Sequence, residues 1–291
     1  MPHPVSAGAA GNVSLGKLTV HRLGYGAMRI TGKGIWGPPA DHDGAIATLR
    51  RAVELGVNFI DTADSYGPNV SEELIAEALH PYPADLVVAT KGGWQRVGPG
   101  QWIHNATPNH LQEAVEGSLK RLRLDRIAVY QLHIPDPAVS FDASMECLAD
   151  LRSQGKIQYV ALSNVTLEHL ERARKIVPIV SVQNRYSFAD REWDYLLEHC
   201  EKHGIAFIPW APLGQNRQAH DLLNRIAGEL SASPMQVALA WLLSRSRIML
   251  PIPGTSSVAH VEENIAAASL KISDDFFEEL SSFEAPPAVL R

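Results

Sequence analysis

The feature of this sequence that most restricts its fold is a regular alternation of short apolar runs with amphipathic stretches of helical period. Apolar runs typical of buried strands occupy 22–27, 57–60, 86–90, 127–132, 158–162, 179–182, 206–208 and 248–252. Helical patterns follow them at 41–55, 71–79, 108–122, 141–154, 167–176, 191–203, 218–230, 234–245 and 257–267. Strict strand–helix alternation implies parallel strands joined by right-handed crossovers.

Eight such units in 291 residues favour a closed (β/α)8 TIM barrel over an open sheet. The composition does not change along the chain, so we expect a single domain over 12–291. It should carry a short N-terminal hairpin, formed by 13–18 and 20–23, and a C-terminal helix at 274–283. Residues 1–11 are rich in Pro, Gly and Ala and are expected to form a flexible tail, and the glycine-rich stretch 92–106 reads as a long loop.

Charge and hydropathy argue against several classes of partner. The net charge is −6 and the pI about 6.0, which does not suit nucleic acid or an anionic membrane surface. No apolar run approaches the roughly 18 residues of a membrane span, and the first residues do not read as a signal peptide. Cys147 and Cys200 belong to no CxxC pair, so we expect a reducing, cytoplasmic setting.

Polar residues follow three of the predicted strands at their C-terminal ends. Asp61 and Tyr66 come after 57–60, Lys91 after 86–90, and His133 after 127–132. In a parallel barrel these strand ends meet at one mouth, which is where ligands bind. The sequence therefore predicts that these four side chains form one site.

The chemistry of the four residues is that of a tuned proton donor. A lysine that closes an apolar strand needs a partner, and Asp61 on the adjacent strand can supply it. A Lys91 ammonium near Tyr66 should lower the pKa of the phenol, and His133 could hydrogen-bond a substrate oxygen. The alternatives are a capping Asp with an interfacial Tyr, or a structural Asp–Lys pair beside an incidental His. Asp64 is open to two interpretations, a loop cap or a substrate contact.

The combined pattern resembles the aldo-keto reductase superfamily. The resemblance rests on Asp61-Thr-Ala-x-x-Tyr66-Gly67, on Lys91 and His133, and on the run Gly155-Lys-Ile-Gln-Tyr-Val-Ala-Leu-Ser-Asn164, and it extends over 15–283. Within the superfamily, Tyr25-Gly-Ala-Met28, Gly37-Pro-Pro and the runs 234–243 and 252–260 resemble the bacterial pyridoxal reductase-like branch.

The resemblance implies an NAD(P)H-dependent reductase of aldehydes or ketones. Tyr66 would be the general acid, Asp61 and Lys91 its tuning pair, and His133 would orient the carbonyl. Pyridoxal or another small aldehyde is the candidate substrate. Residues expected to line the substrate are Trp36, Tyr66, Trp94 and His133, although Trp36 and Trp94 suit loop packing equally well. No metal is expected.

The resemblance also implies a cofactor site. Trp210 would carry the nicotinamide, Ser163, Asn164 and Gln183 its carboxamide, and 213–216 the pyrophosphate. Thr255, Ser256 and the following helix start would hold the adenosine phosphate, with Glu263 and Asn264 at the adenine. The full expected set is Gly26, Met28, Asp61, Ser163, Asn164, Gln183, Trp210, Leu213, Gly214, Gln215, Asn216, Ile252, Gly254, Thr255, Ser256, His260, Glu263 and Asn264.

One departure bears on cofactor choice. Many relatives carry Lys and Arg where this chain has Gly254 and His260, and no Lys or Arg occurs between Arg247 and Lys271. Recognition of a 2′-phosphate would then rest on hydroxyls, backbone N–H groups and His260. The branch resemblance still favours NADP over NAD.

Two other functions compete with this interpretation. One is a cofactor-binding regulatory or channel-associated subunit with weak turnover, because the same fold serves such proteins. The other is a metal-dependent barrel hydrolase, which should carry several His and Asp ligands at strand ends, whereas only His133 closes a strand. The expected partner is a small carbonyl substrate, without nucleic acid or membrane, and the chain is expected to be a monomer or a weak homo-oligomer.

Overall fold

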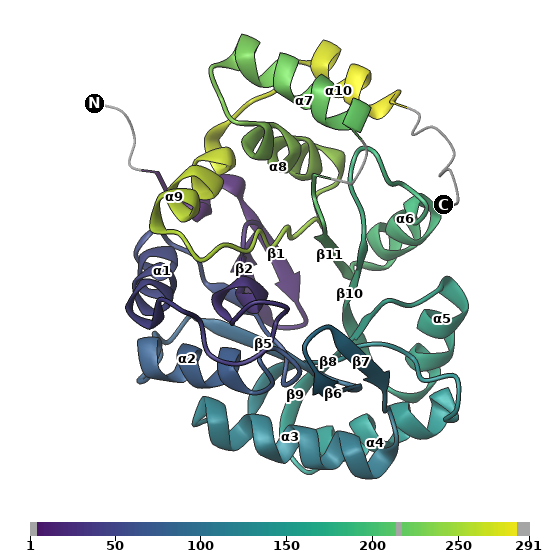
Figure 1. Ribbon diagram of the computed structural model, residues 1–291. Helices are drawn as coiled ribbons and strands as arrows, with labels where there is room; N and C mark the ends of the chain where they lie inside the picture. The colour runs from purple at the N-terminus through teal and green to yellow at the C-terminus, as the bar shows by residue number, and fades with distance from the viewer. Residues whose placement is uncertain (1–4, 214–216, 284–291) are drawn as a thin grey trace.

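A computed structural model describes residues 5–213 and 217–283 (Figure 1). Its main sheet contains seven parallel strands that curl around a common axis. In spatial order they are β11 (Ala206–Trp210), β10 (Ile179–Arg185), β9 (Ile157–Ser163), β8 (Ile127–Leu132), β5 (Val87–Gly92), β4 (Phe59–Asp61) and β3 (Tyr25–Gly26).

The extended segment 248–253 closes this sheet into a barrel between its two edge strands. On one side the N–H of Phe207 donates to Ile248 O (2.9 Å) and the N–H of Leu250 to Phe207 O (2.8 Å). On the other side the N–H of Gly24 donates to Pro251 O (2.9 Å). The predicted eighth strand is therefore in place but is not a regular strand, because Pro251 and Pro253 have no N–H to donate. The predicted (β/α)8 barrel is confirmed.

Helices surround the barrel, and most of them begin at a residue that caps them. Thr107, Ser140, Thr166, Ser233 and Ser257 each accept a hydrogen bond from the N–H three residues ahead, which satisfies a free helix donor. The helices are α1 (His42–Glu54), α2 (Val70–Leu79), α3 (Pro108–Leu122), α4 (Phe141–Ser153), α5 (Leu167–Ile176), α6 (Asp194–His203), α7 (Arg217–Leu230), α8 (Pro234–Arg245), α9 (Val258–Ala266) and α10 (Asp274–Ser281).

The barrel interior is a packed apolar core, which a hairpin covers at the end where the parallel strands begin. Inward-facing residues of the strands, such as Phe59, Val129 and Ile208, form one cluster with Val13, Leu15 and Val20. The latter three belong to the antiparallel hairpin of β1 (Asn12–Leu15) and β2 (Leu18–His21). The predicted N-terminal hairpin is thus confirmed, and it seals the end of the barrel opposite the predicted site.

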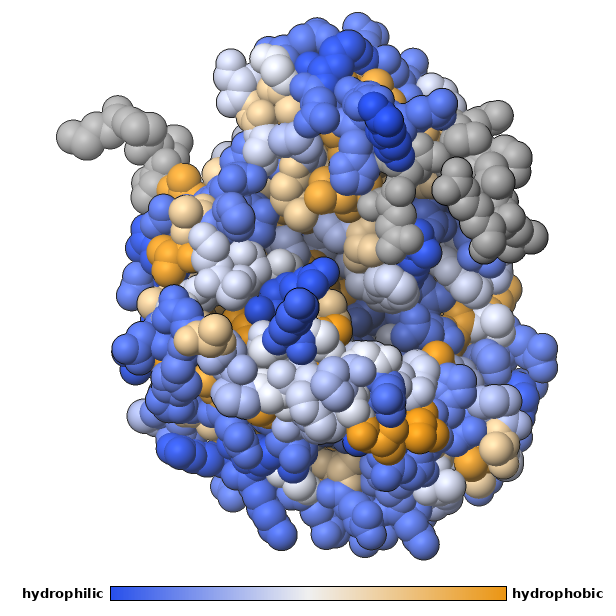
Figure 2. Space-filling view, in the orientation of Figure 1, coloured by the Kyte–Doolittle hydropathy of each residue, from blue (hydrophilic) through white to orange (hydrophobic). Residues whose placement is uncertain are grey.

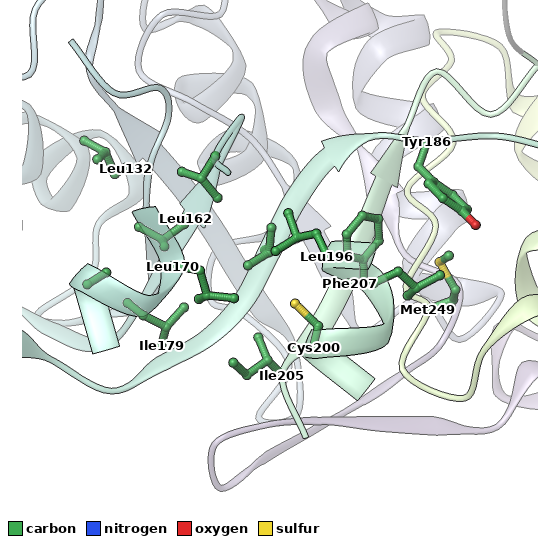
Figure 3. Close-up of a cluster of buried hydrophobic side chains, with 14 of the residues drawn as sticks. Leu132, Leu162, Leu170, Ile179, Tyr186, Leu196, Cys200, Ile205, Phe207 and Met249 are labelled. Atoms are coloured by element: carbon green, nitrogen blue, oxygen red, sulfur yellow. The ribbon is translucent and has the colours of Figure 1, made fainter. Parts of the chain in front are cut away.

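A second apolar layer fills the space between the strands and the outer helices. Figure 3 shows part of it, where Leu196 and Cys200 of α6 lie beside Phe207 of β11, and Leu170 of α5 lies beside Ile179 of β10. Burying such side chains contributes about 1.5–3 kcal/mol each, so this layer holds the helices on the sheet. Among the described residues, no helix is both long and apolar enough to cross a membrane.

Two sequence expectations need correction. The stretch expected as a long loop contains an antiparallel hairpin, β6 (Trp94–Gly98) and β7 (Gln101–His104), which turns at Pro99-Gly100. Of the expected flexible tail, residues 5–11 contain a short 3-10 helix, η1 (Ala7–Ala10). Ala7 is fully buried and its N–H donates to Leu55 O (2.8 Å), so this segment packs against the end of α1.

Candidate active site

Asp61 and Lys91 meet because their strands are neighbours in parallel register. Asp61 ends β4 and Lys91 lies near the end of β5, with Asp61 beside Ala89. The Lys91 Nζ lies 2.6 Å from Asp61 Oδ2, 2.8 Å from Thr62 O and 3.3 Å from the Tyr66 hydroxyl. Lys91 is fully buried, so the ammonium has exchanged water for these three oxygens.

The other oxygen of Asp61 is held by two glutamines that come from different strands. Gln131 Nε2 donates to Asp61 Oδ1 at 2.7 Å and Gln183 Nε2 donates to it at 2.9 Å. Gln131 was not predicted as a site residue. A sequence signal was available, because a Gln inside an apolar strand, two residues before His133, is expected to face the same side as that histidine.

Tyr66 and His133 face each other at the mouth. Tyr66 lies in the turn between β4 and α2, and its ring meets that of His133 edge to face with centroids 5.8 Å apart. Ser65 Oγ is 3.4 Å from His133 Nδ1. The structure therefore brings all four predicted catalytic side chains together and adds Ser65 to the group.

Burial dominates the protonation behaviour of these groups. Burial raises the pKa of Tyr66, and Lys91 lowers it as expected but offsets only part of the rise, so the net shift is upward. Burial alone would lower the pKa of Lys91, but Asp61 and Tyr66 bring it above its ordinary value. Burial and the nearby Lys91 charge hold the pKa of His133 well below its usual range, so the imidazole is neutral at pH 7.

Aromatic side chains surround the mouth above these residues. The Trp94 ring lies 6.4 Å from that of His133 and 4.4 Å from that of His104, and Trp36 forms a β-bridge with Gly67. Figure 2 shows this face, which is hollowed near its middle beside the hairpin of β6 and β7. Trp94 therefore lies beside His133, and the backbone of Trp36 pairs with Gly67, the residue after Tyr66.

The residues expected at the nicotinamide lie on three neighbouring strands. Trp210 ends β11 with 37% of its surface exposed, which is unusual for an indole and leaves a face for a flat ring. Ser163 ends β9, and Asn164 follows it with a φ of 56°, its Nδ2 donating to His133 O (3.0 Å) and to Ser163 Oγ (3.1 Å). The amide nitrogen of Gln183 is bonded to Asp61 and Gln131, which leaves its carbonyl oxygen as the atom that can face the nicotinamide carboxamide.

The residues expected at the adenosine end gather after the closing segment of the barrel. Ser257 caps α9 and accepts from the N–H of His260, while Thr255 Oγ1 accepts from the N–H of Ser257 (3.1 Å). The Tyr25 hydroxyl donates to Thr255 O and fixes this turn to β3. The start of α9 thus places the hydroxyls of Thr255 and Ser257 beside the N–H groups of the first helical turn.

Other expected cofactor residues lie along the same side of the mouth. The N–H of Gly26 donates to Pro253 O (3.4 Å), which places Gly26 beside Ile252 and Gly254, and Met28 follows two residues later. Glu263 and Asn264 are on α9, where Asn264 is buried. Ser256 lies between Thr255 and the helix cap, and Leu213 is half-buried after β11. Gly214, Gln215 and Asn216 lie outside the described residues.

Arg29 is a cation near the adenosine end that the sequence motifs did not indicate. It is exposed at the end of the 3-10 helix η2 (Ala27–Ile30), and a Cβ placed on Gly254 would lie 3.6 Å from its Cγ. Among the described residues, no carboxylate lies within ion-pair distance of it. The side chain of Arg29 therefore starts beside Gly254, the position where the family resemblance led us to expect a lysine.

Asp64 matches neither of its sequence interpretations closely. The cap position of α2 is Asn69, and Asp64 is 8% exposed with its Oδ1 lacking a hydrogen-bond partner among the described residues. Burial first, and then repulsion from Glu72, raises the pKa of Asp64 to about 8. Glu72 itself is fully buried and accepts from Thr90 Oγ1 (2.5 Å) and Arg121 Nε (2.7 Å).

Comparison with known proteins places the chain among relatives of this architecture. The sequence model of the aldo/keto reductase family matches residues 22–285. An uncharacterized oxidoreductase of Schizosaccharomyces pombe is 46% identical over 278 residues, which cover 95% of this chain and 90% of the relative. Pyridoxine 4-dehydrogenase of Escherichia coli is 45% identical over 274 residues, which cover 92% of this chain and 96% of that protein.

Solved structures agree with the sequence relatives. The glycerol dehydrogenase from Gluconobacter oxydans has a TM-score of 0.83 and 25% identity, with 94% of each chain covered. An aldo-keto reductase from Klebsiella pneumoniae in complex with NADPH has a TM-score of 0.79 and 26% identity, covering 95% of this chain and 96% of that one.

Proposed function

This chain belongs to the aldo/keto reductase family and is an NADP(H)-dependent oxidoreductase that reduces an aldehyde or ketone to an alcohol, and we propose that Tyr66 is its proton donor. The observation that carries this role is the contact between the Tyr66 hydroxyl and the buried ammonium of Lys91. The nicotinamide supplies the hydride to the carbonyl carbon, and the oxygen must then receive a proton.

The polar groups around Tyr66 suit a developing alkoxide. The Lys91 charge stabilises the tyrosinate that remains after proton transfer, and Asp61 keeps Lys91 in place. A neutral His133 has one N–H to donate. If Ser65 donates to Nδ1, that N–H is on Nε2 and can hydrogen-bond the substrate oxygen. All these donors are fixed before substrate arrives, which avoids reorganisation in the transition state.

The described residues fit a nicotinamide dinucleotide at the mouth. The exposed indole of Trp210 offers a stacking surface, and Ser163, Asn164 and Gln183 lie on the strands that lead to it. Because the Gln183 amide nitrogen is bonded to Asp61, we expect its carbonyl oxygen to accept from the carboxamide. The start of α9 suits a phosphate. We propose that a dinucleotide with its nicotinamide on Trp210 and its adenosine phosphate at this helix start contacts the other cofactor residues expected from the sequence.

The proposed preference for NADP over NAD rests on Arg29. A 2′-phosphate adds a dianion that a nearby guanidinium can bind in a bidentate manner. Arg29 lies beside Gly254 and so can supply the charge that this chain lacks at residue 254. His260, one turn into α9, is the second candidate contact.

Pyridoxal is the proposed substrate. It is the aldehyde that corresponds to oxidation of pyridoxine at position 4, the reaction in the name of the 45%-identical relative. Tryptophan and histidine rings around the mouth suit a flat heteroaromatic molecule. A regulatory or channel-associated role is not favoured, because these relatives are oxidoreductases.

We also propose that the protein is cytoplasmic, because Cys147 and Cys200 are both free. Two further proposals are a single barrel domain over 12–291 and a monomeric or weakly associated state.

The test combines cofactor binding with turnover. NADPH and NADH are titrated into the protein by calorimetry, and loss of the reduced nicotinamide absorbance is then followed on adding pyridoxal. Tighter binding of NADPH with turnover of pyridoxal is the expected result. Turnover of a small aliphatic aldehyde without pyridoxal would refute the substrate, and equal affinity for NADH would refute the cofactor preference.

A further inference from the structure

Arg96 uses every donor of its guanidinium on backbone carbonyl groups at the mouth. Arg96 lies on β6, and its Nε donates to Gln101 O at 3.2 Å. Its Nη1 donates to Ile35 O (2.8 Å) and Ser65 O (2.9 Å), and its Nη2 donates to Gly34 O (3.2 Å) and Gly98 O (3.5 Å). These five bonds match the five N–H groups of an arginine.

The five carbonyl groups belong to three segments that are separate in the sequence. They are the loop 32–37 before α1, the turn 64–67 after β4, and the hairpin of β6 and β7. One acceptor, Ile35, has a φ of 56°, a conformation that β-branched residues avoid. Such strain persists only where surrounding contacts impose it, and Arg96 supplies one of them.

The same guanidinium packs against two indoles at the mouth. Its carbon lies 3.8 Å from the centre of the Trp102 ring and 5.6 Å from the centre of the Trp36 ring. No carboxylate among the residues described here is within ion-pair distance of Arg96. Its charge is therefore balanced by carbonyl dipoles and ring faces, an arrangement that lysine cannot reproduce with three donors.

These contacts fix the backbone on both sides of Tyr66. Arg96 binds the carbonyl of Ser65, the residue before Tyr66, and the Ser65 side chain meets His133. On the other side the N–H of Gly37 donates to Gly67 O at 2.6 Å, and Trp36 pairs with Gly67. The loop that Arg96 holds by Ile35 thus also holds the residue after Tyr66.

We propose that Arg96 is a positioning residue, which places Tyr66 and the indoles of the mouth by tying the loop 32–37 and the hairpin to the turn that carries Tyr66. It touches no reacting atom. The proposal rests on the proposed role of Tyr66 as proton donor. A misplacement of about 1 Å at a reacting group lowers rates about a hundredfold, so small shifts of this turn should be measurable.

The test compares Arg96→Ala and Arg96→Lys with Arg152→Ala. Arg152 is the matched control, because it too donates to a backbone carbonyl, that of Gln158, but at the opposite end of the barrel. Both Arg96 variants should lose about 10- to 100-fold in kcat/KM. Relative to wild type, the KM for pyridoxal should rise more than the KM for a small aliphatic aldehyde. The affinity for NADPH should be retained. Added guanidinium ion should restore part of the rate in Arg96→Ala.

Hydrogen exchange separates this proposal from the proposed function. Amides of 32–37 and 65–67 should exchange faster in both Arg96 variants and not in Arg152→Ala, whether or not pyridoxal is reduced. Any one of three results would overturn the proposal. They are a wild-type kcat/KM in Arg96→Ala, unchanged amide exchange in the two segments, and a loss of NADPH affinity that parallels the loss of kcat/KM. If wild-type protein reduces no aldehyde, the function fails, and the exchange data still decide whether Arg96 fixes the turn.

Discussion

The Nζ of Lys91 lies 3.3 Å from the hydroxyl of Tyr66, and both side chains are buried at the mouth of the barrel. Burial raises the pKa of Tyr66, while the ammonium opposes that rise. The phenol is therefore protonated at neutral pH and has a cation beside the oxygen that becomes negative when it gives up its proton. This is the arrangement that a general acid needs.

Replacing Tyr66 with Phe should remove turnover while leaving cofactor binding intact. The ring keeps its packing against His133, but the proton donor is lost, and general acid catalysis contributes about 10²- to 10⁴-fold. Single-turnover reduction of pyridoxal and calorimetric titration with NADPH measure the two properties separately. Turnover at the wild-type rate would remove Tyr66 from the proposed role.

Asp61→Asn should destabilise the fold because it leaves Lys91 buried without its counter-charge. Breaking a buried ion pair by removing one partner costs about 3–5 kcal/mol. The double variant Asp61→Asn with Lys91→Met should regain a large part of that free energy of unfolding, since no unpaired ammonium remains. Urea unfolding of the wild type and the two variants measures this, and a stable single variant would contradict an ion pair at this place.

The barrel and its four central residues were predictable because each rests on a local pattern. Apolar runs mark the strands, and a polar residue directly after a strand lies at the mouth once the strands are parallel. The hairpin of β6 and β7 was missed because its glycines and Pro99 suggested a loop. A signal for a hairpin was present in the sequence. Large side chains occur at every second position on both sides of Pro99-Gly100, at Trp94 and Arg96 before it and at Trp102 and His104 after it.

Contacts between distant segments were not predictable in the same way. Gln131 and Gln183 are polar residues inside apolar strands, but only the packing of the strands shows that both donate to Asp61. Arg29 precedes Gly254 by 225 positions, so its place in the sequence gives no sign that it lies beside the cofactor motif. The sign of the pKa shift at Tyr66 depends on its burial, which residue order alone does not give.

Arg29→Ala should weaken binding of NADPH more than binding of NADH. Loss of one contact to a 2′-phosphate should raise the Kd for NADPH about tenfold, which corresponds to about 1.4 kcal/mol. NADH lacks that phosphate, so its Kd should hardly change, and the difference should shrink as salt is added. Lys33→Ala, which removes another exposed cation nearby in the sequence, is the control. Equal effects on both cofactors would place Arg29 away from the 2′-phosphate.

Asp64→Asn should make the stability of the protein less dependent on pH. The folded-state pKa of Asp64 is about 8, whereas an unfolded aspartate titrates near about 3.9. A raised folded pKa contributes stability that is full below about pH 4 and is lost as the pH rises through 8, by up to about 1.4 kcal/mol per pH unit. The neutral amide cannot lose a proton, so the free energy of unfolding of the variant should rise relative to that of the wild type between pH 5 and 8. Urea unfolding across this range, with the exposed Asp125→Asn as control, measures the change. Parallel pH profiles for wild type and Asp64→Asn would show that the buried carboxyl is ionised at neutral pH.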